Sequence, residues 1–389
     1  MHLIATRFYL CGMSYSPKTK LGILGGGQLG RMLIQETINL DIDVHILDPD
    51  DNAPCKNIAH AFTVGSFKDY NTVLNFGQGM DVITIEIEHV NVDALEVLES
   101  QGIKVYPQPN VIRLIQDKGA QKQFYSEHNI PTSEYRLIGQ NEAANHTDFF
   151  PVFQKLRQGG YDGKGVQALN SAADVGKAFN EPSVLEKAVD LDKELSVIVA
   201  RNAAGEIKSF PTVELEFNPI ANLVEFLFSP ANVATQVEET AQKLAKKVAE
   251  KLEIVGLLAV ELFLDKEGNV LVNEVAPRPH NSGHQSIEGN YTSQFMQHIR
   301  AIIGLSLGNT EIVKPSVMVN LLGEDGFSGI AKYEGLEDVL ALKGVNVHLY
   351  GKQLTKPYRK MGHVTVVSET LEEAKTIAKT VQQTLKVKA

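Results

Sequence analysis

The sequence has little cysteine, no long apolar segment and no excess of positive charge, and each absence excludes a class of protein. Cys11 and Cys55 are its only cysteines, too few for a disulfide scaffold or a zinc site of four thiolates. No window holds the ~18 consecutive apolar residues that span a membrane, and a chain poor in cysteine suits a reducing cytoplasm. The formal net charge of −10 argues against binding to a nucleic acid backbone. We therefore expect a cytoplasmic protein that contacts neither membranes nor nucleic acids.

The length of 389 residues predicts two or three domains. The first twenty residues do not resemble a signal peptide, because Arg7 divides their apolar residues. Met13 lies shortly before the first strong strand signal. We expect residues 1–20 to form a loose tail outside the fold, or translation to start at Met13.

Strands and helices alternate in the first part of the chain. Apolar runs at 21–24, 44–47 and 82–87 predict strands, and the pattern after the first run predicts a helix over 29–40. This alternation is typical of a parallel sheet in an open α/β domain. Pro107 and Pro109 predict its end.

From residue 110 onward the sequence is rich in strand signals. Helices are predicted over 110–128 and 237–252, the second with a clear apolar face. Strands are predicted at 152–156, 165–169, 183–186, 194–200, 208–215, 257–265 and 270–275, and in the last part of the chain at 316–322, 345–350 and 362–367. A capping box formed by Thr370 and Glu373 starts a closing helix.

A glycine motif at 25–30 follows the first predicted strand and opens a helix. It fits G-x-G-x-x-G, and Asp48 ends the second strand, close to the dinucleotide-binding fingerprint. NAD binding, binding of any phosphate at the helix N-terminus, and a tight turn that binds nothing all agree with this motif. The later sequence contains no second nucleotide-binding half, which favours the phosphate interpretation.

Two glutamates fall opposite each other in a predicted hairpin. If residues 266–269 form its loop, Asp265 pairs with Val270 and Glu261 faces Glu274. Opposed carboxylates repel, so a shared proton, a lysine or a divalent cation must offset the repulsion. Oxygen ligands without nearby cysteine or clustered histidine favour Mg²⁺ or Mn²⁺. A register shifted by one residue would instead leave one glutamate in solvent.

A second glycine-rich segment, residues 158–165, lies between two predicted strands. Lys155 and Lys164 flank or belong to it, and such a loop can fold over phosphates. It is not a Walker motif, and an ordinary hairpin tip remains the alternative. Glu186 at a strand end and Glu194 could accept hydrogen bonds from adenine or ribose, but this signal is weak by itself and favours solvated charge.

Two basic segments follow in the second half of the chain. Residues 278–284 carry Arg, His and Asn donors that suit a small anion such as bicarbonate. His280 and His284 have the spacing of zinc ligands on a helix, but the intervening Asn-Ser-Gly disfavours a helix. The densest basic cluster contains Lys352, Lys356, Arg359, Lys360 and His363. It predicts either a site for a phosphate-bearing substrate or a solvated face.

Together these motifs resemble the ATP-grasp enzymes, and among them the 5-(carboxyamino)imidazole ribonucleotide synthase family. The resemblance runs from about Lys20 to the C-terminus, through residues 25–32, 159–165, Glu261, 273–274, 278–284 and 359–363. It implies an α/β and α+β multidomain protein. A Rossmann-like domain would span 21–109, an ATP-grasp domain 110–310 with a lid at about 130–190, and a small β-rich domain 311–389.

The resemblance also implies a reaction of purine (IMP) synthesis. ATP and bicarbonate would give carboxyphosphate, whose carboxyl group would pass to the amine of 5-aminoimidazole ribonucleotide, with ADP and phosphate released. The implied cofactors are ATP and Mg²⁺, with Mn²⁺ as a substitute. Members of the family are commonly homodimers, so the resemblance implies a homodimer as well.

The resemblance assigns residues to each part of the site. It implies ATP contacts by Arg113, Lys155, Gly160, Tyr161, Asp162, Gly163, Lys164, Gly165, Val166, Glu186, Lys187, Ala188, Val189, Glu194, Asn273 and Glu274. It implies metal ligation by Glu261 and Glu274, in agreement with the hairpin argument. The ribonucleotide site would comprise Gly27, Gln28, Leu29, Glu86, Tyr161, Lys352, Arg359 and Lys360. Arg278, His280 and Asn281 would hold bicarbonate or carboxyphosphate and, with Lys352, would be the catalytic residues.

Two positions depart from the pattern of the family. Phe217 stands where many members carry a histidine after the strand around Glu214, and Val166 replaces the usual glutamine at the end of the glycine loop. The ATP contact expected at Phe217 is therefore in question. At Val166 a backbone contact would survive the change, whereas a side-chain contact would not.

Three alternative functions agree with parts of the sequence. Another ATP-grasp ligase, such as a formate-using glycinamide ribonucleotide enzyme, would share the fold and the metal site. An NAD-dependent oxidoreductase would explain the first glycine motif and Asp48 but not Glu261 and Glu274. A non-catalytic nucleotide-binding regulator would show no turnover.

Overall fold

The computed structural model describes residues 17–160, 165–218 and 223–389. Its N-terminal part is a five-stranded parallel sheet in the order β3-β2-β1-β4-β5. The strands are β1 (Lys20–Leu24), β2 (Asp43–Asp48), β3 (Ala61–Val64), β4 (Val82–Ile85) and β5 (Lys104–Val105). They alternate with the helices α1 (Gln28–Ile38), α2 (Tyr70–Gly77) and α3 (Val92–Ser100). The alternating sequence pattern therefore predicted this parallel α/β layer correctly.

The helix predicted over 110–128 is divided into two. α4 (Pro109–Ile115) ends at Gln116, and α5 (Lys118–Glu127) begins after Asp117. The Asp117 side chain accepts hydrogen bonds from the backbone N–H groups of Gly119 and Ala120, which makes it an N-cap. The prediction of one continuous helix was wrong because it overlooked this capping residue.

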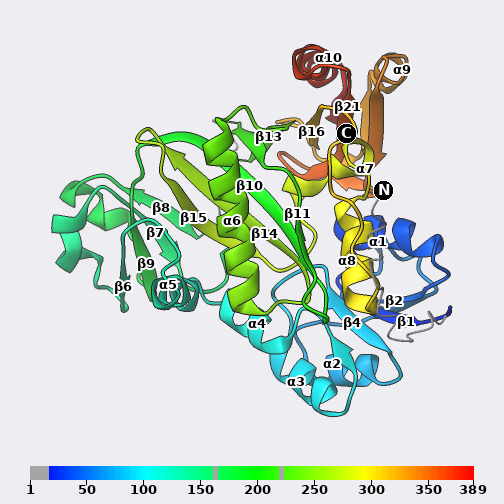
Figure 1. The fold of residues 1–389 in the computed structure, drawn as a ribbon, viewed down its shortest axis with the longest axis horizontal. Coiled ribbons are helices and arrows are strands. Elements are labelled where there is room, and N and C mark those ends of the chain that lie inside the picture. The colour runs from blue at the N-terminus through cyan, green and yellow to red at the C-terminus, as the bar shows by residue number, and fades with distance from the viewer. Residues whose placement is uncertain (1–16, 161–164, 219–222) are drawn as a thin grey trace, which may run out of the picture.

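A nine-stranded sheet forms the centre of the molecule (Figure 1). Its order is β15-β14-β10-β12-β13-β16-β21-β19, with β11 paired to β10. The strands are β10 (Leu191–Arg201), β11 (Ile207–Ser209), β12 (Val213–Phe217), β13 (Val224–Ser229), β14 (Gly256–Asp265), β15 (Val270–Ala276), β16 (Ser316–Leu322), β19 (Val345–Leu349) and β21 (Lys360–Val367). The single strand predicted at 208–215 is β11 and β12, because Pro211 interrupts the ladder.

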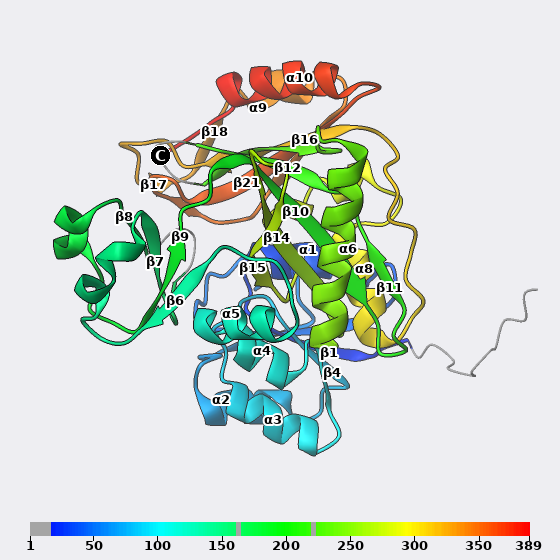
Figure 2. The same cartoon turned by 60° about the vertical axis from the view of Figure 1, so that its left-hand side comes forward.

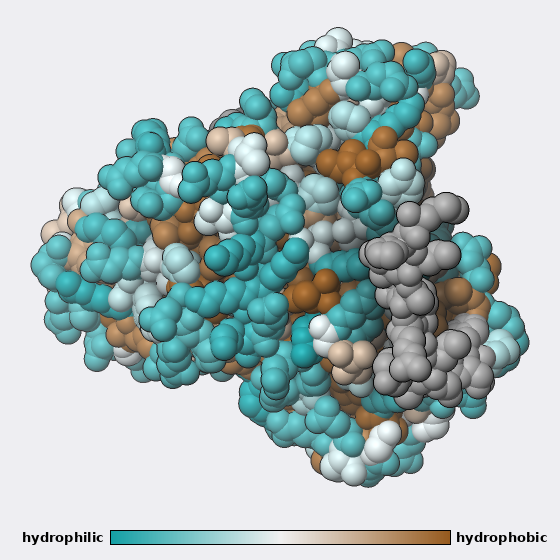
Figure 3. All heavy atoms as spheres, in the orientation of Figure 1, coloured by the Kyte–Doolittle hydropathy of each residue, from teal (hydrophilic) through white to brown (hydrophobic). Residues whose placement is uncertain are grey.

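Helices cover both faces of the middle of this sheet. α6 (Thr235–Leu252) packs Leu244 and Val248 against alternate residues of β14, including Leu258 and Val260. Its outward side is hydrophilic in Figure 3, as its amphipathic sequence predicts. α8 (Gln294–Ile303) packs on the opposite face, where Ala301 belongs to the cluster that contains Leu257 and Ala259. Polar side chains that alternate with the α6-facing residues therefore lie on the α8 side of the sheet.

A small antiparallel sheet lies at one end of the central sheet (Figures 1 and 2). Its order is β6-β9-β7-β8, formed by β6 (Tyr135–Ile138), β7 (Val152–Leu156), β8 (Val166–Leu169) and β9 (Ser183–Lys187). The short 3₁₀ helices η1 (Ala143–Phe149) and η2 (Ala172–Lys177) accompany it. Thr132 forms an isolated bridge to Val272 of β15, so the chain entering the small sheet is attached to the edge of the large one.

The C-terminal strands continue the central sheet, since β16 pairs with β13. α10 (Leu371–Thr384) packs on them, and Thr370 caps it by accepting from the backbone N–H of Glu373. Only this half of the predicted capping box forms, because the Glu373 carboxylate accepts from the Ser368 hydroxyl instead. Shorter elements complete this part: η3 (Asn281–Gly283), α7 (Ser286–Gly289), β17 (Gly329–Ile330), β18 (Lys332–Glu334), α9 (Leu336–Leu340), β20 (Leu354–Thr355) and β22 (Lys386–Lys388). None of the described helices is long and apolar enough to cross a membrane.

Candidate functional site

The two hairpin glutamates lie opposite each other, as the sequence predicted. Glu261 of β14 pairs with Glu274 of β15, and Glu261 also faces Ser196 of β10. Both glutamates lie on the α8 side of the sheet, because the alternate residues Val260 and Val275 belong to the core under α6.

The turn of this hairpin and the pairing next to it differ from the prediction. Val270 pairs with Leu264 rather than with Asp265, and the Asp265 N–H donates to the Asn269 carbonyl at 3.1 Å, so the turn is one residue shorter than assumed. A β-bulge between Glu261 and Leu262 then restores the pairing. Because the bulge breaks the alternation of β15, the consecutive residues Asn273 and Glu274 both reach polar partners in the site.

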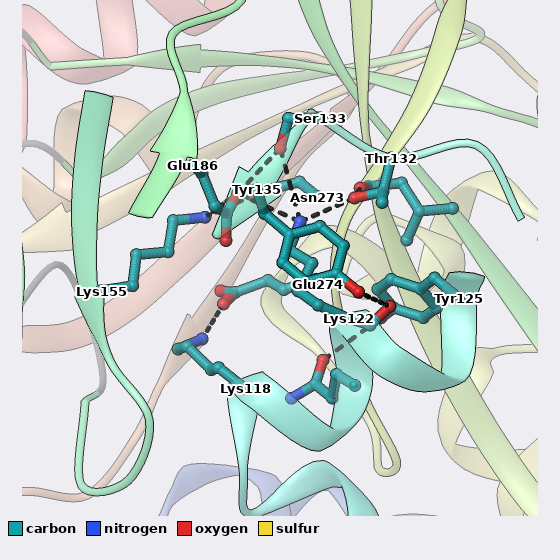
Figure 4. A network of polar contacts seen from close by, with 12 residues as sticks. Lys118, Lys122, Tyr125, Thr132, Ser133, Tyr135, Lys155, Glu186, Asn273 and Glu274 are labelled. Carbon is teal, nitrogen blue, oxygen red and sulfur yellow. Dashed lines mark hydrogen bonds and ion pairs between the residues drawn. The ribbon is translucent and has the colours of Figure 1, made fainter. Parts of the chain in front are cut away.

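Three lysines approach the carboxylates from the small sheet and from α5 (Figure 4). Lys155 of β7 contacts Glu186 of β9 at 3.1 Å and donates to Asn273 Oδ1 at 2.8 Å. Lys122 of α5 lies 3.1 Å from the same Glu186 oxygen. Lys118 of α5 forms an ion pair with Glu274. The contact between Lys155 and Asn273 joins the small sheet to the large one directly.

Lys118 and Lys122 were not identified from the sequence. They are one helical turn apart at the start of α5, where a cation is unfavourable beside the positive end of the helix dipole. For Lys118, in the first turn, that unfavourable position was the available signal, since an anionic partner would offset its cost. The partners come from strands far along the chain, so the sequence does not indicate them.

Burial and neighbouring charges set the pKa values of this cluster. Burial lowers the pKa of Lys122 to about 8, and the charge of Lys155 adds to this shift while Glu186 opposes it. Burial alone would raise the pKa of Glu186, but the charges of Lys155 and Lys122 outweigh it and the net shift is downward. Burial also raises the pKa of Glu194, the predicted ribose acceptor on β10, to about 6.

The opposed glutamates are shifted in opposite directions. Burial and the charge of Glu274 raise the pKa of Glu261, whereas the ammonium of Lys118 lowers the pKa of Glu274. Lys118 thus offsets part of the repulsion expected from the sequence. Within the described residues, no group of three or more His, Cys, Asp or Glu side chains could hold a metal by itself. Two carboxylates suit Mg²⁺ that takes its other ligands from phosphates and water.

Residues 278–284, which we call the anion loop, follow β15 and lie against these carboxylates. His280 Nε2 lies 3.4 Å from Glu261 Oε1. Arg278 forms an ion pair of 2.8 Å with Glu88, which follows β4 of the N-terminal sheet. Asn281 exchanges two hydrogen bonds of 2.9 Å with the side chain of Asn320 on β16. The anion loop therefore contacts the N-terminal sheet, the central sheet and its C-terminal extension.

The glycines of the first turn make room for a carboxylate of the protein itself, rather than marking a dinucleotide-binding site. A side chain at Gly27 would collide with Glu86, and a Cβ at Gly25 would lie 2.8 Å from Glu86 Oε2. Glu86 also accepts the backbone N–H of Leu29 at 3.2 Å. Asp48 accepts from the Gly26 N–H at 2.7 Å, so the acidic residue of the NAD interpretation stabilises the turn itself. The glycines are explained by the space that these carboxylates occupy.

Lys352 connects the C-terminal basic segment to this turn. It donates to Gln28 Oε1 at 2.6 Å and to the Lys360 carbonyl at 2.7 Å. Burial raises the pKa of Glu86 to about 7, and the positive charges of Arg278 and Lys352 oppose that shift. Arg359 donates to the Leu354 carbonyl at 2.7 Å. The anion loop and the basic segment therefore act electrostatically on the same carboxylate.

Several predicted residues lie apart from the cluster or outside the described residues. Arg113 forms ion pairs with Asp93 and Glu96 of α3. Lys187 donates to the backbone carbonyls of Phe149 and Phe150. His363 of the basic segment is fully buried, which removes it from the surface that the sequence suggested. Tyr161, Asp162, Gly163 and Lys164 lie outside the described residues.

The remaining ATP positions line the small sheet and its surroundings. Val166 begins β8 and pairs with Lys155, while Gly160 and Gly165 border the undescribed segment. Ala188 and Val189 follow the end of β9. Phe217 packs against an apolar cluster that includes Leu215 and Leu227. The contacts of all these residues with a nucleotide stay predictions.

Family models match three successive parts of the chain. They are a ribonucleotide synthetase preATP-grasp domain over residues 18–116, an ATP-grasp domain over 123–295 and a phosphoribosylaminoimidazole carboxylase C-terminal domain over 316–376. Their order agrees with the parallel sheet, the central sheet and its C-terminal extension.

Known proteins resemble the chain over nearly its whole length. The N5-carboxyaminoimidazole ribonucleotide synthase of Bacillus subtilis is 37% identical over 366 residues, which cover 92% of this chain and 93% of that protein. A chloroplastic phosphoribosylaminoimidazole carboxylase of Vigna aconitifolia is 41% identical, but the chain spans only 64% of its length.

Solved structures give the same result. The N5-carboxyaminoimidazole ribonucleotide synthetase of Thermotoga maritima has a TM-score of 0.89 and 42% identity, and covers 95% of this chain with 99% of its own. An Aspergillus clavatus enzyme in complex with ADP and 5-aminoimidazole ribonucleotide has a TM-score of 0.86 and 35% identity, with coverage of 95% and 99%. The chain therefore belongs to the N5-carboxyaminoimidazole ribonucleotide synthase family of ATP-grasp proteins.

Proposed function

We propose that this chain carboxylates the amine of 5-aminoimidazole ribonucleotide, with ATP and bicarbonate as co-substrates, in purine synthesis. The observation that carries the proposal is the position of the anion loop. It contacts the carboxylate pair through His280 and Glu261, and the N-terminal sheet through Arg278 and Glu88. A small anion held there would lie between a nucleotide at the lysine cluster and a ribonucleotide at the first glycine turn.

The ATP end of this site comprises Lys118, Lys122, Lys155, Glu186, Glu261 and Glu274. Phosphoryl transfer depends mainly on positioning and on neutralising charge. Lys155, which the contacts with Glu186 and Asn273 hold in place, would bind the phosphates. Glu261 and Glu274 would hold Mg²⁺, which would supply neutralisation of phosphate charge when bound. Bicarbonate oxygen would attack the terminal phosphorus, so that ADP leaves and carboxyphosphate remains.

The ribonucleotide end comprises Gln28, Glu86, Lys352, Arg359 and Lys360. Lys352, Arg359 and Lys360 would bind the phosphate of the ribonucleotide, and the backbone beside Gln28 would fix its position. The amine would attack the carbon of carboxyphosphate; the C–N bond forms, phosphate leaves, and the nitrogen loses a proton. Arg278, His280 and Asn281 would hold the intermediate during this transfer. Enclosure matters because water would otherwise destroy carboxyphosphate.

The test is ADP release by the purified protein with Mg·ATP and bicarbonate, with and without 5-aminoimidazole ribonucleotide. We expect release to depend on the ribonucleotide and to be lost in Glu274→Gln. Glu267→Gln, in the exposed turn of the same hairpin, should behave as wild type. Release indifferent to the ribonucleotide would indicate another ATP-grasp ligase. No release under any condition would contradict the proposal.

The proposal extends to the setting of the enzyme. We propose a cytoplasmic homodimer in which residues 130–190 act as a lid over the nucleotide. Light scattering during gel filtration measures the mass of the particle, and a monomeric mass at micromolar concentration would contradict the dimer. Protease protection of residues 130–190 by Mg·ATP would support the lid.

A further inference from the structure

The anion loop is attached to α8 by one fully buried side chain, Gln294. Its Oε1 accepts the backbone N–H of His280 at 2.8 Å, and its Nε2 donates to the carbonyl of the same residue at 2.7 Å. One amide thus satisfies both backbone groups of His280, which we call the Gln294 clamp. His280 is the residue whose side chain lies against Glu261.

The two backbone bonds fix the orientation of the amide, because only Oε1 can accept and only Nε2 can donate. Nε2 also lies 3.0 Å from Nδ1 of His284, a fully buried residue of the anion loop. That contact is a hydrogen bond only if Nδ1 accepts, which requires neutral His284 protonated at Nε2. Burial holds the pKa of His284 well below its ordinary value, and the charge of His280 adds to this shift.

The loop backbone and neighbouring side chains pack closely around the Gln294 clamp. A Cβ at Gly283 would lie 2.5 Å from the Gln294 amide carbon, so the loop backbone passes directly over the amide. The His284 ring lies 5.7 Å from the Phe295 ring and 4.8 Å from the ring of His363 on β21. Ser286 accepts the backbone N–H of Gln294 and donates to the Gly283 carbonyl. The clamp therefore holds the loop at several points against rigid elements.

We propose that Gln294 is a positioning residue, which fixes the backbone of His280 so that the anion loop can hold bicarbonate and carboxyphosphate, and that His284 orients the Gln294 amide. This inference rests on the proposed function for its catalytic meaning. Its structural content, the clamp itself, can be measured without activity.

The same helix provides a matched control. Gln297, also fully buried, accepts the Gly308 N–H through Oε1 at 2.7 Å and donates to the Gly308 carbonyl through Nε2 at 2.9 Å. The two glutamines thus make equivalent bonds one helical turn apart. Only Gln294 holds the anion loop. Gln294→Met and Gln297→Met remove equivalent interactions, so a difference between the variants reports on what each clamp holds.

The first measurement is kinetic. We expect Gln294→Met to lower kcat/KM for bicarbonate by about 10- to 100-fold, since misplacement of a reacting group by 1 Å has effects of this size. The KM values for ATP and ribonucleotide should stay within about threefold of wild type. More ADP should form per carboxylated product, because poorly held carboxyphosphate escapes to water. Gln297→Met should lose similar thermal stability with little kinetic change. Equal kinetic losses in both variants would overturn the positioning role.

The second measurement is amide hydrogen exchange of the full chain. Exchange of the peptide containing His280 should be at least about tenfold faster in Gln294→Met, and exchange at Gly308 faster only in Gln297→Met. Unchanged exchange at His280 would overturn the clamp. If the wild type proves inactive while His280 exchange behaves as expected, the proposed function fails and the clamp stands.

Two further variants test the role of His284. His284→Asn offers an acceptor near the position of Nδ1, whereas His284→Leu offers none. We expect His284→Asn to retain several times more activity with bicarbonate than His284→Leu. Equal activity of the two variants would remove His284 from the proposal.

Discussion

The two ends of the site hold their cations in different ways. At the ATP end, Lys118, Lys122 and Lys155 contact Glu274 or Glu186, so each ammonium is paired with a carboxylate. At the ribonucleotide end, Lys352 and Arg359 donate to neutral carbonyl oxygens. Lys352 and Glu86 interact there through their charges.

This difference matters for the ligands that each end would take. The carbonyl oxygens orient Lys352 and Arg359 without adding a negative charge, so these contacts leave positive charge that can attract a phosphate. Paired ammoniums are neutralised in part, so binding a nucleotide polyphosphate at the ATP end would require further cations. The two ends should therefore respond differently to substitution, mainly in folding stability at one and in substrate affinity at the other.

The largest effect should follow from Glu186→Gln at the ATP end. The change leaves Lys122 and Lys155 buried near each other without their shared carboxylate. Breaking buried ion pairs typically costs about 3–5 kcal/mol, and we expect a loss of this order in urea unfolding without nucleotide. Glu214→Gln, which breaks a more exposed pair with Lys193, should cost less than about 1 kcal/mol. Equal losses of unfolding free energy in the two variants would contradict the distinction between the buried and the more exposed ion pair.

The next effect is expected at the ribonucleotide end, in Lys352→Met. Hydrogen bonds to charged groups contribute about 1.5–3 kcal/mol, so KM for the ribonucleotide should rise about 10- to 100-fold. The ATP KM should change little, because Lys352 lies at the other end of the site. The free energy of unfolding should fall less than in Glu186→Gln, because Lys352 donates to the neutral oxygens of Gln28 and Lys360. Lys356→Met, an exposed lysine of the same segment, is the control. A rise in ATP KM instead would reverse the assignment of the two ends.

A smaller effect concerns Glu86 and pH. Its folded pKa of about 7 lies above the unfolded value of about 4.3. The folded state therefore binds the proton more tightly, and stability from this group is lost as pH rises from about 4 to 7. Glu86→Gln should gain stability relative to wild type by about 2 kcal/mol between pH 5 and 7.5. Urea unfolding at both pH values measures the difference in unfolding free energy between the variant and wild type. If that difference is the same at both pH values, the pKa of Glu86 is not raised.

The smallest effect tests Arg113, which we propose to contact ATP phosphates. Its exposed pairs with Asp93 and Glu96 would have to break, at a cost of about 0.2–1 kcal/mol each. Asp93→Asn combined with Glu96→Gln should therefore lower the ATP KM by about two- to threefold. Adding Arg113→Met should abolish that gain. An ATP KM unchanged by the double variant would leave Arg113 as a surface residue.

The sequence predicted those features that depend on neighbours in the chain. Hydrophobic alternation identified most strands, and the opposition of Glu261 and Glu274 was correct. Even there two local errors cancelled, because the turn is one residue shorter than assumed and the bulge at Asn273 adds one residue to β15. Such compensation cannot be deduced from alternation, since a single added residue reverses the faces.

Contacts between distant segments were not predictable in the same way. The pairing of Lys118 with Glu274 joins residues 156 positions apart, and nothing in either local pattern specifies the partner. The glycines at 25 and 27 were recognised as a motif, but the sequence did not reveal why they are glycines. The reason is that Glu86 fills the space beside them. The Gln294 clamp also gave no sequence signal, since its partners are backbone atoms.

The pairing of β16 with β13 has a consequence for shortened forms of the protein. Without residues 311–389, β13 would become a sheet edge with a row of unsatisfied backbone groups. Phe226 and Phe228 of that strand would also lose the apolar cluster they share with Val317 and Val319. The preceding residues expressed alone should consequently self-associate through this exposed edge. The C-terminal segment therefore protects the protein against aggregation by covering the edge.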